Sequence, residues 1–132
     1  MNSFDDLIVD EASFAYRNLV GVDRWETNWT VSSSVSTAGT LTASGRYRIQ
    51  GRQCEFQAQL QGSTSIATTS GTHYLALPIS PAKGLGGIAA MVNTSTNVAV
   101  GVCSINVSTS RCYLPSLGAS AAPHVVAGWY EI

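Results

Sequence analysis

The chain has 132 residues and a formal net charge of -1, which suits one domain with a single hydrophobic core. Charged residues make up 11% of it, against roughly 25% in ordinary globular domains. Binding that relies on neutralising phosphates needs clustered Lys and Arg, so this composition argues against a nucleic-acid-binding protein. So few charges also indicate that part of the uncharged surface is buried against further copies of the chain.

Residues 1–24 differ from the rest of the chain and are predicted to be a short irregular or helical attachment segment or linker, followed by a domain at 25–132. Residues 10–19 fit a short helix with Asp10 as its N-cap, or equally an extended connector. Asp5 and Asp6 stand where a secretory signal would carry positive charge, so no signal peptide is expected.

From Trp25 onward the sequence predicts short strands separated by Gly, Asn, Ser and Pro. The strands are expected at 29–33, 39–43, 46–50, 53–61, 73–77, 87–93, 97–103, 104–107, 111–114 and 124–132. Gly51-Arg52 is a tight hairpin turn, residues 63–72 read as a polar loop, and 93–97 read as a hairpin loop. Regularly spaced strands with no helix between them predict an all-β fold, an antiparallel β-sandwich or jelly roll.

The run 53–61 alternates polar and apolar residues without an error, which is typical of a strand with one wet face. Cys54, Phe56, Ala58 and Leu60 are expected to face the core, and the residues between them solvent or a partner. The longest apolar run, at 88–92, is too short to cross a bilayer, so no membrane insertion is expected.

The three cysteines, Cys54, Cys103 and Cys112, allow one disulfide plus a free thiol or three reduced thiols. Cys54 and Cys103 fall on apolar-patterned strands and are expected to be buried thiols. His73 and His124 have no partners at metal-binding spacing, so the sequence predicts neither a metal site nor a cofactor.

The sequence contains no set of residues that together would form a catalytic site. The chain has no nucleophile elbow, and neither Glu55 nor Glu131 has a second acid nearby in sequence. The Gly-rich stretch 83–87 begins with its lysine, unlike a phosphate-binding loop, and reads as a turn. The prediction is that the protein is not an enzyme and has no catalytic residues, with an esterase-like activity kept only as a formal alternative.

Aromatic residues are the better candidates for function, because a flat ring covers apolar area while a polar tip forms hydrogen bonds. Filling the core or a subunit interface is the competing interpretation for each of them. The predicted binding residues are Trp25, Trp29, Tyr47, Tyr74 and Tyr113. Arg46 and Arg48 share one strand face, which suits an edge strand protected by charge against aggregation.

Three stretches carry a resemblance to a known family. They are Gly45-Arg46-Tyr47-Arg48-Ile49-Gln50-Gly51, then Gly71-Thr72-His73-Tyr74-Leu75-Ala76-Leu77-Pro78, and the ending Val125-Val126-Ala127-Gly128-Trp129-Tyr130-Glu131-Ile132. In this order they resemble the C-terminal β domains of bacteriophage tail-fibre and related virion proteins, over roughly 39–132. The resemblance implies a homotrimeric domain on a virion, made in the host cytoplasm, and it carries over no catalytic residue.

The predicted function is therefore a non-enzymatic virion structural or receptor-binding domain, of tail-fibre or baseplate type. Its expected partners are two further copies of itself, other virion proteins, and a glycan or protein of the host surface. The alternative is a lectin-like carbohydrate-binding module outside a virion. The last strand is expected to close the sheet, with the core on one side and a neighbouring subunit on the other.

Overall fold

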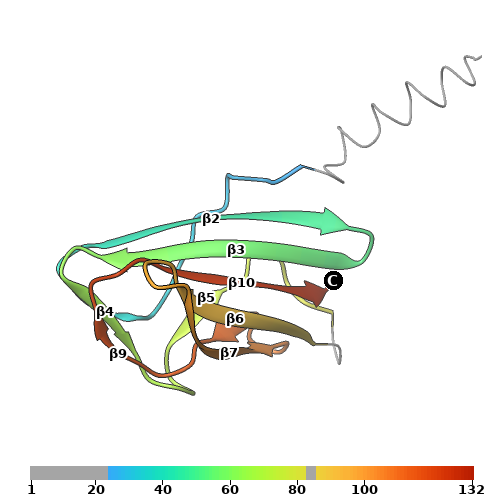
Figure 1. The fold of residues 1–132 in the computed structure, drawn as a ribbon. Coiled ribbons are helices and arrows are strands. Elements are labelled where there is room, and N and C mark those ends of the chain that lie inside the picture. Colours follow the sequence, from blue (N-terminus) through green and yellow to red (C-terminus); the bar gives the residue numbers. More distant parts are fainter. Residues whose placement is uncertain (1–23, 83–85) are drawn as a thin grey trace, which may run out of the picture.

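The computed structural model describes residues 24–82 and 86–132, and these fold into ten strands in two antiparallel sheets, with no helix among them (Figure 1). The predicted all-β antiparallel sandwich is confirmed. The predicted helix at 10–19 and nearly all of the 1–24 segment lie outside the described residues. In chain order the strands are β1 (Ser36–Ala38), β2 (Leu41–Gln50), β3 (Gln53–Gly62), β4 (Ser65–Thr68), β5 (Tyr74–Ala76), β6 (Gly87–Asn93), β7 (Val98–Asn106), β8 (Arg111–Tyr113), β9 (Leu117–Ser120) and β10 (His124–Glu131).

The large sheet has the order β2-β3-β10-β6-β7-β8-β5. Its first two strands form the predicted hairpin, which turns at Gly51 with a φ of 62°, a conformation that glycine adopts without strain. The strands expected at 39–43 and 46–50 are one strand, β2, because Ser44 and Gly45 continue the pairing opposite Gln59 and Ala58.

The C-terminal strand β10 lies in the interior of the large sheet and not at its end. Val126 pairs with Ala58 of β3 on one side and with Met91 of β6 on the other (Figure 1). The expectation that the last strand closes the sheet is therefore wrong in its topology, because β10 joins the hairpin to β6 and is hydrogen-bonded along both edges.

The far end of the large sheet is built from β7, β8 and β5. The strands expected at 97–103 and 104–107 are one strand, β7, whose first part pairs with β6 and whose last residues pair with β8. The predicted hairpin loop at 93–97 is confirmed. Its Asn93 Oδ1 accepts hydrogen bonds from the amides of Ser95 and Thr96, and Asn97 takes a positive φ of 58°.

The small sheet, in the order β1-β4-β9, was missed by the sequence patterns. Residues 63–72 were expected to be a polar loop, yet β4 forms there, because Ile66 is fully buried and Thr68 is almost so. Conversely, 29–33 is not a strand, and only Ser33 makes an isolated bridge, to Leu75. Short segments rich in Ser and Thr have the composition of loops. Their strand conformation depends on packing against the large sheet, which the local sequence does not reveal.

The core lies between the two sheets and contains the inward residues of β3 as predicted, with Cys54, Phe56, Ala58 and Leu60 each at most 1% exposed. Tyr130 is fully buried beside Phe56, at a ring separation of 5.8 Å. Its hydroxyl donates to the carbonyl of Ile79 at 2.6 Å and accepts from the Ile79 amide at 3.1 Å. This buried hydroxyl thus both donates and accepts, and it holds the backbone of Ile79 against β10.

All three cysteines are free and buried, which confirms the predicted burial of Cys54 and Cys103 and answers the open question of a disulfide. Burial raises the pKa of the Cys54 thiol above its ordinary value of 9.0. A hydrogen bond with the Cys103 thiol, followed by burial, raises the pKa of Cys112. Since the thiolate is the reactive form, neither Cys54 nor Cys112 is a nucleophile at neutral pH.

Candidate binding surface

The five aromatic residues predicted to bind a ligand fall into three separate places. Trp25 lies on the outer face of the large sheet, that is, the face turned away from the core. Trp29 and Tyr47 pack against the core, and Tyr74 and Tyr113 lie together at the far end of the sheet. The structure therefore does not bring them together as one site.

Trp29 and Tyr47 contribute to packing. The Trp29 ring stands edge-on to the rings of Tyr47 and Phe56, at 6.5 and 6.2 Å. It covers Gly45 so closely that a Cβ at this position would lie 2.7 Å from ring carbons. Glycine is required at position 45 for this contact, and the competing interpretation, that these two aromatics fill the interior, holds for both.

Tyr74 and Tyr113 face each other across β5 and β8, with ring centroids 5.8 Å apart. The guanidinium of Arg111 lies 3.9 Å from the Tyr74 ring centroid and donates to the Tyr113 hydroxyl at 3.4 Å. These contacts join the two short strands through their side chains.

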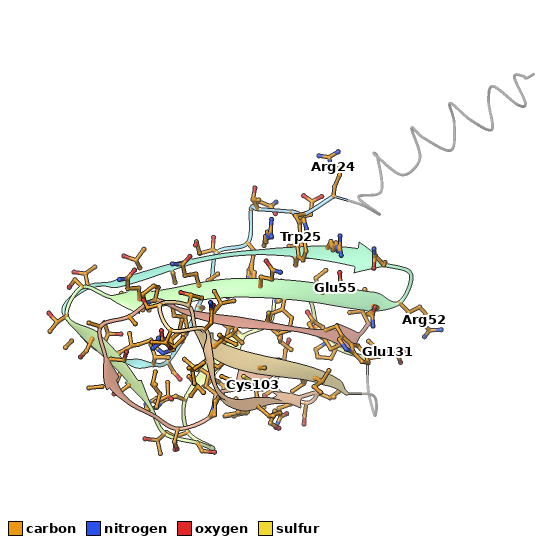
Figure 2. The ribbon with its side chains drawn as sticks, viewed as in Figure 1. Arg24, Trp25, Arg52, Glu55, Cys103 and Glu131 are labelled. Carbon is orange, nitrogen blue, oxygen red and sulfur yellow. The ribbon has the colours of Figure 1, made fainter. Side chains whose placement is uncertain are left out.

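Trp25 is held on the outer face by two arginines of β2. The guanidinium carbons of Arg46 and Arg48 lie 4.4 and 4.6 Å from its ring centroid. The neighbouring residue, Glu26, exchanges two backbone hydrogen bonds with Tyr47, which fixes this segment along the exposed edge of β2. Figure 2 shows Trp25 on the segment that passes over the hairpin, Glu55 on β3, and Arg52 projecting from the hairpin turn.

The outer face of the hairpin carries paired polar side chains. Arg46 lies opposite Gln57 and donates to its Oε1 from Nε and Nη2, at 3.0 and 2.9 Å. Arg48 lies opposite Glu55 and forms an ion pair with it. We call this set, with Ser44 and Gln59 in the next row, the polar half of the outer face.

The outer face of β6 and β7 is aliphatic, and we call it the apolar half: Ile88, Ala90, Val92, Ala99 and Val102. Ile88 is 55% exposed and Val102 is 71% exposed, and neither strand contains a charged residue. Trp129 of β10, 38% exposed, lies between Glu55 and Ile88 and therefore at the seam of the two halves. Trp129 is not among the five predicted binding residues, although its alternation with the buried Tyr130 places it on the outward face of β10.

The remaining polar groups offer little chemistry. His73 Nδ1 accepts from the Thr69 amide at 2.8 Å, and His124 Nδ1 lies 2.9 Å from the Ala122 carbonyl, while its buried Nε2 has no partner. Among residues 24–82 and 86–132, no three His, Cys, Asp or Glu side chains gather as a metal site would require. The described part of the chain also contains no helix long and apolar enough to cross a membrane.

Comparison of the chain with protein-family models, with curated proteins and with solved structures finds no match.

Proposed function

We propose that this chain is a non-enzymatic structural or receptor-binding domain of a bacteriophage virion, and that it works as a homotrimer. The observation that carries the proposal is the apolar half of the outer face. A monomer rarely leaves a contiguous aliphatic surface of this kind in water, and such surfaces mark protein interfaces.

The seat of self-association is the outer face of β6 and β7. Ile88 and Val102 are both more than half exposed in the single chain. Fully burying a side chain of this size contributes about 1.5–3 kcal/mol. Because no charge lies on either strand, a second copy meets no desolvation cost from an unpaired ion there.

The number of copies and the virion setting rest on the family resemblance of the sequence. A trimer uses one patch against a different patch of the next copy around a closed three-fold axis. Other virion proteins and the host surface are the remaining proposed partners.

Two measurements test the proposal. Light scattering of the purified protein should give about three times 13.9 kDa at micromolar concentration. Peptide mass spectrometry of purified phage particles from the producing host should detect the chain in intact virions, at a level comparable with known structural proteins. A monomer mass contradicts the trimer, and absence from the particles contradicts the virion role.

A carbohydrate-binding module outside a virion is the second candidate. It is favoured by Trp25, a partly exposed indole held beside Arg46 and Arg48 on an open surface. Flanking genes for tail or capsid proteins favour the virion domain, and flanking genes for polysaccharide enzymes favour the module.

A further inference from the structure

A shallow groove runs over the polar half of the outer face, across β2, β3 and β10. Its first hollow has a volume of about 320 Å³ and is lined by Trp25, Arg48, Glu55, Gln57, Ala127 and Trp129, among others. A second hollow of about 370 Å³ adjoins it at Gln57 and continues past Arg46 to Gln59 and Val125. From the Trp129 row to the Val125 row is four residues of strand, or about 13 Å, the length of a short oligosaccharide.

The walls of the first hollow are aromatic. Trp25 lies over the β2 arginines and Trp129 lies on β10, and these two strands are separated by β3, so that their axes are about 10 Å apart. The face of an indole is negative, so it attracts the weakly positive C–H groups on the flat side of a pyranose ring. The two guanidinium groups beside Trp25 hold its ring in position, which lowers the entropy lost when a ligand stacks on it.

The floor between the two rings is polar. Sugar hydroxyls both donate and accept hydrogen bonds, and the floor offers both kinds of partner in Arg48, Glu55 and Gln57. These side chains are held in fixed geometry by the cross-strand pairs, Arg48 with Glu55 and Arg46 with Gln57.

The charge of the floor determines whether neutral or acidic sugars bind better. Arg48 is balanced by Glu55, whereas the cross-strand partner of Arg46 is the neutral amide of Gln57. A guanidinium has five N–H donors, and within the described residues two of those of Arg46, Nε and Nη2, are directed at Gln57 Oε1. The charged side chains that line the two hollows are Arg46, Arg48 and Glu55, which leaves one positive charge in excess among them. Arginine is the residue type best suited to binding a carboxylate through two hydrogen bonds.

We propose that the groove between Trp25 and Trp129 binds an acidic oligosaccharide, with a pyranose ring stacked on an indole and a uronate carboxylate on Arg46. This proposal rests on the proposed receptor-binding function, for which it names the class of receptor. Polysaccharides of this class are recognised here by stacking plus a single charge contact, without any bond being made or broken.

The test uses the full chain in its native assembly and a panel of defined oligosaccharides. The panel contains hexuronate tetrasaccharides and the same compounds with their carboxylates reduced to alcohols. We expect at least one acidic tetrasaccharide to bind, and its reduced form to bind about tenfold more weakly, as the loss of one charge-assisted contact predicts.

Variants locate the site. Trp25→Ala should weaken binding of the acidic tetrasaccharide at least about tenfold, and Trp25→Phe less, since a smaller ring face remains. Arg46→Gln should remove the preference for the acidic form over the reduced form. Arg52→Gln is the matched control, because it removes the same charge from the exposed turn of the same hairpin, away from the groove, and should leave that preference intact (Figure 2).

Melting temperature and assembly mass are measured for each variant, so that a folding defect is not read as loss of a contact. The proposal is overturned if no acidic tetrasaccharide of the panel binds at millimolar concentration. It is also overturned if folded Trp25→Ala and Arg46→Gln bind like the parent protein.

The outcome is distinguishable from a failure of the proposed function. A trimer found in virions that binds no acidic sugar refutes the groove and leaves the virion role standing. Binding that depends on Trp25 in a protein absent from virions refutes the virion role and leaves the groove standing.

Discussion

The polar and apolar halves of the outer face share one sheet, one set of antiparallel pairings and one core beneath them, yet they meet solvent with opposite chemistry. On the hairpin the outward rows pair Arg46 with Gln57 and Arg48 with Glu55. Two strands further on, the corresponding row pairs Ala90 with Val102. A strand with alternating polar and apolar residues buries one face in the core and exposes the other to water. A continuously apolar strand is typical of a position in which both faces are buried. The outward residues of β6 and β7 are aliphatic and exposed, and this is the surface on which we place the proposed contact between copies.

The largest loss of stability is expected from truncating β10, the strand that lies between the two halves. Deletion of residues 128–132 takes away Tyr130 from the core and unpairs the ends of β3 and β6. Exposed ladder edges and an emptied core should leave no folded protein, so we expect aggregation. The measurement is the fraction of protein in the supernatant, together with its circular dichroism and melting curve.

Deletion of Ile132 alone is the control for that truncation. It removes one backbone hydrogen bond, from the Ile132 amide to the Arg52 carbonyl, and one partly buried side chain at the margin of the core, and should leave a folded protein. If the longer truncation stays in solution and melts like the parent, β10 is not the strand that joins the two halves.

The next largest effect on stability is expected from the loss of a single buried hydroxyl, that of Tyr130. Tyr130→Phe keeps the ring against Phe56 but leaves the amide and carbonyl of Ile79 without their partner. An unsatisfied buried polar group costs about 1–3 kcal/mol, and we expect a loss of unfolding free energy in this range. Urea unfolding monitored by fluorescence measures it, and an unchanged midpoint contradicts the hydrogen-bonded arrangement.

Stability should also fall at alkaline pH. Burial, and next a hydrogen bond to Cys54, raises the pKa of Tyr130 above its ordinary value of 10.0, and burial raises the pKa of Cys54 above 9.0. In the unfolded chain these groups lose their protons at the ordinary values, while in the folded chain they retain them. Their contribution is therefore complete below pH 9 and declines as the pH rises toward the folded-state values.

Melting curves between pH 7 and pH 11 test that expectation. The melting temperature should be flat on the acid side of the range and should drop on the alkaline side, less steeply in Tyr130→Phe than in the parent. A melting temperature that is flat to pH 11 would show that these groups titrate equally in both states.

The smallest effect is expected on the polar half. Arg48 and Glu55 are each about 30% exposed, with side-chain values of 28% and 32%, so solvent screens their ion pair. Arg48→Gln should lower the unfolding free energy by less than about 1 kcal/mol. A loss of several kilocalories would mean that the polar half is part of the structural framework and not a surface available for binding.

Sequence patterns predicted the fold best where periodicity was strong. The 53–61 run and its hairpin, β6, and the course of β10 follow from alternation and turn residues, and all appear in the structure. Patterns failed at β1, β4 and β9, where Ser, Thr and Gly dominate and a few buried contacts such as that of Ile66 determine the structure. The sequence patterns also divided β2 and β7 into two strands each, because Gly45 and Ser104 interrupt the run of strand-forming residues. In the structure, the pairing with the neighbouring strands continues through both positions.

The candidate surface was less accessible to sequence reasoning. Trp25 was predicted as a binding residue, but its contact with Arg46 and Arg48 depends on a segment that folds back along β2. Trp29, its near neighbour in the chain, packs against the core for the same reason. The direction of an aromatic side chain in an irregular segment is set by tertiary contacts, and local patterns carry no information about it.

The central claim is that the apolar half is covered by another copy of the chain, and the mass of two lysine variants in solution tests it most directly. Val102→Lys places a charge in the middle of the apolar half, whereas Thr42→Lys places the same charge on an exposed residue of β2. Native mass spectrometry at matched concentrations should show the trimer for the parent and for Thr42→Lys, and folded monomers for Val102→Lys. A Val102→Lys protein that keeps the parent's mass, or a parent that is itself a monomer, would contradict the account.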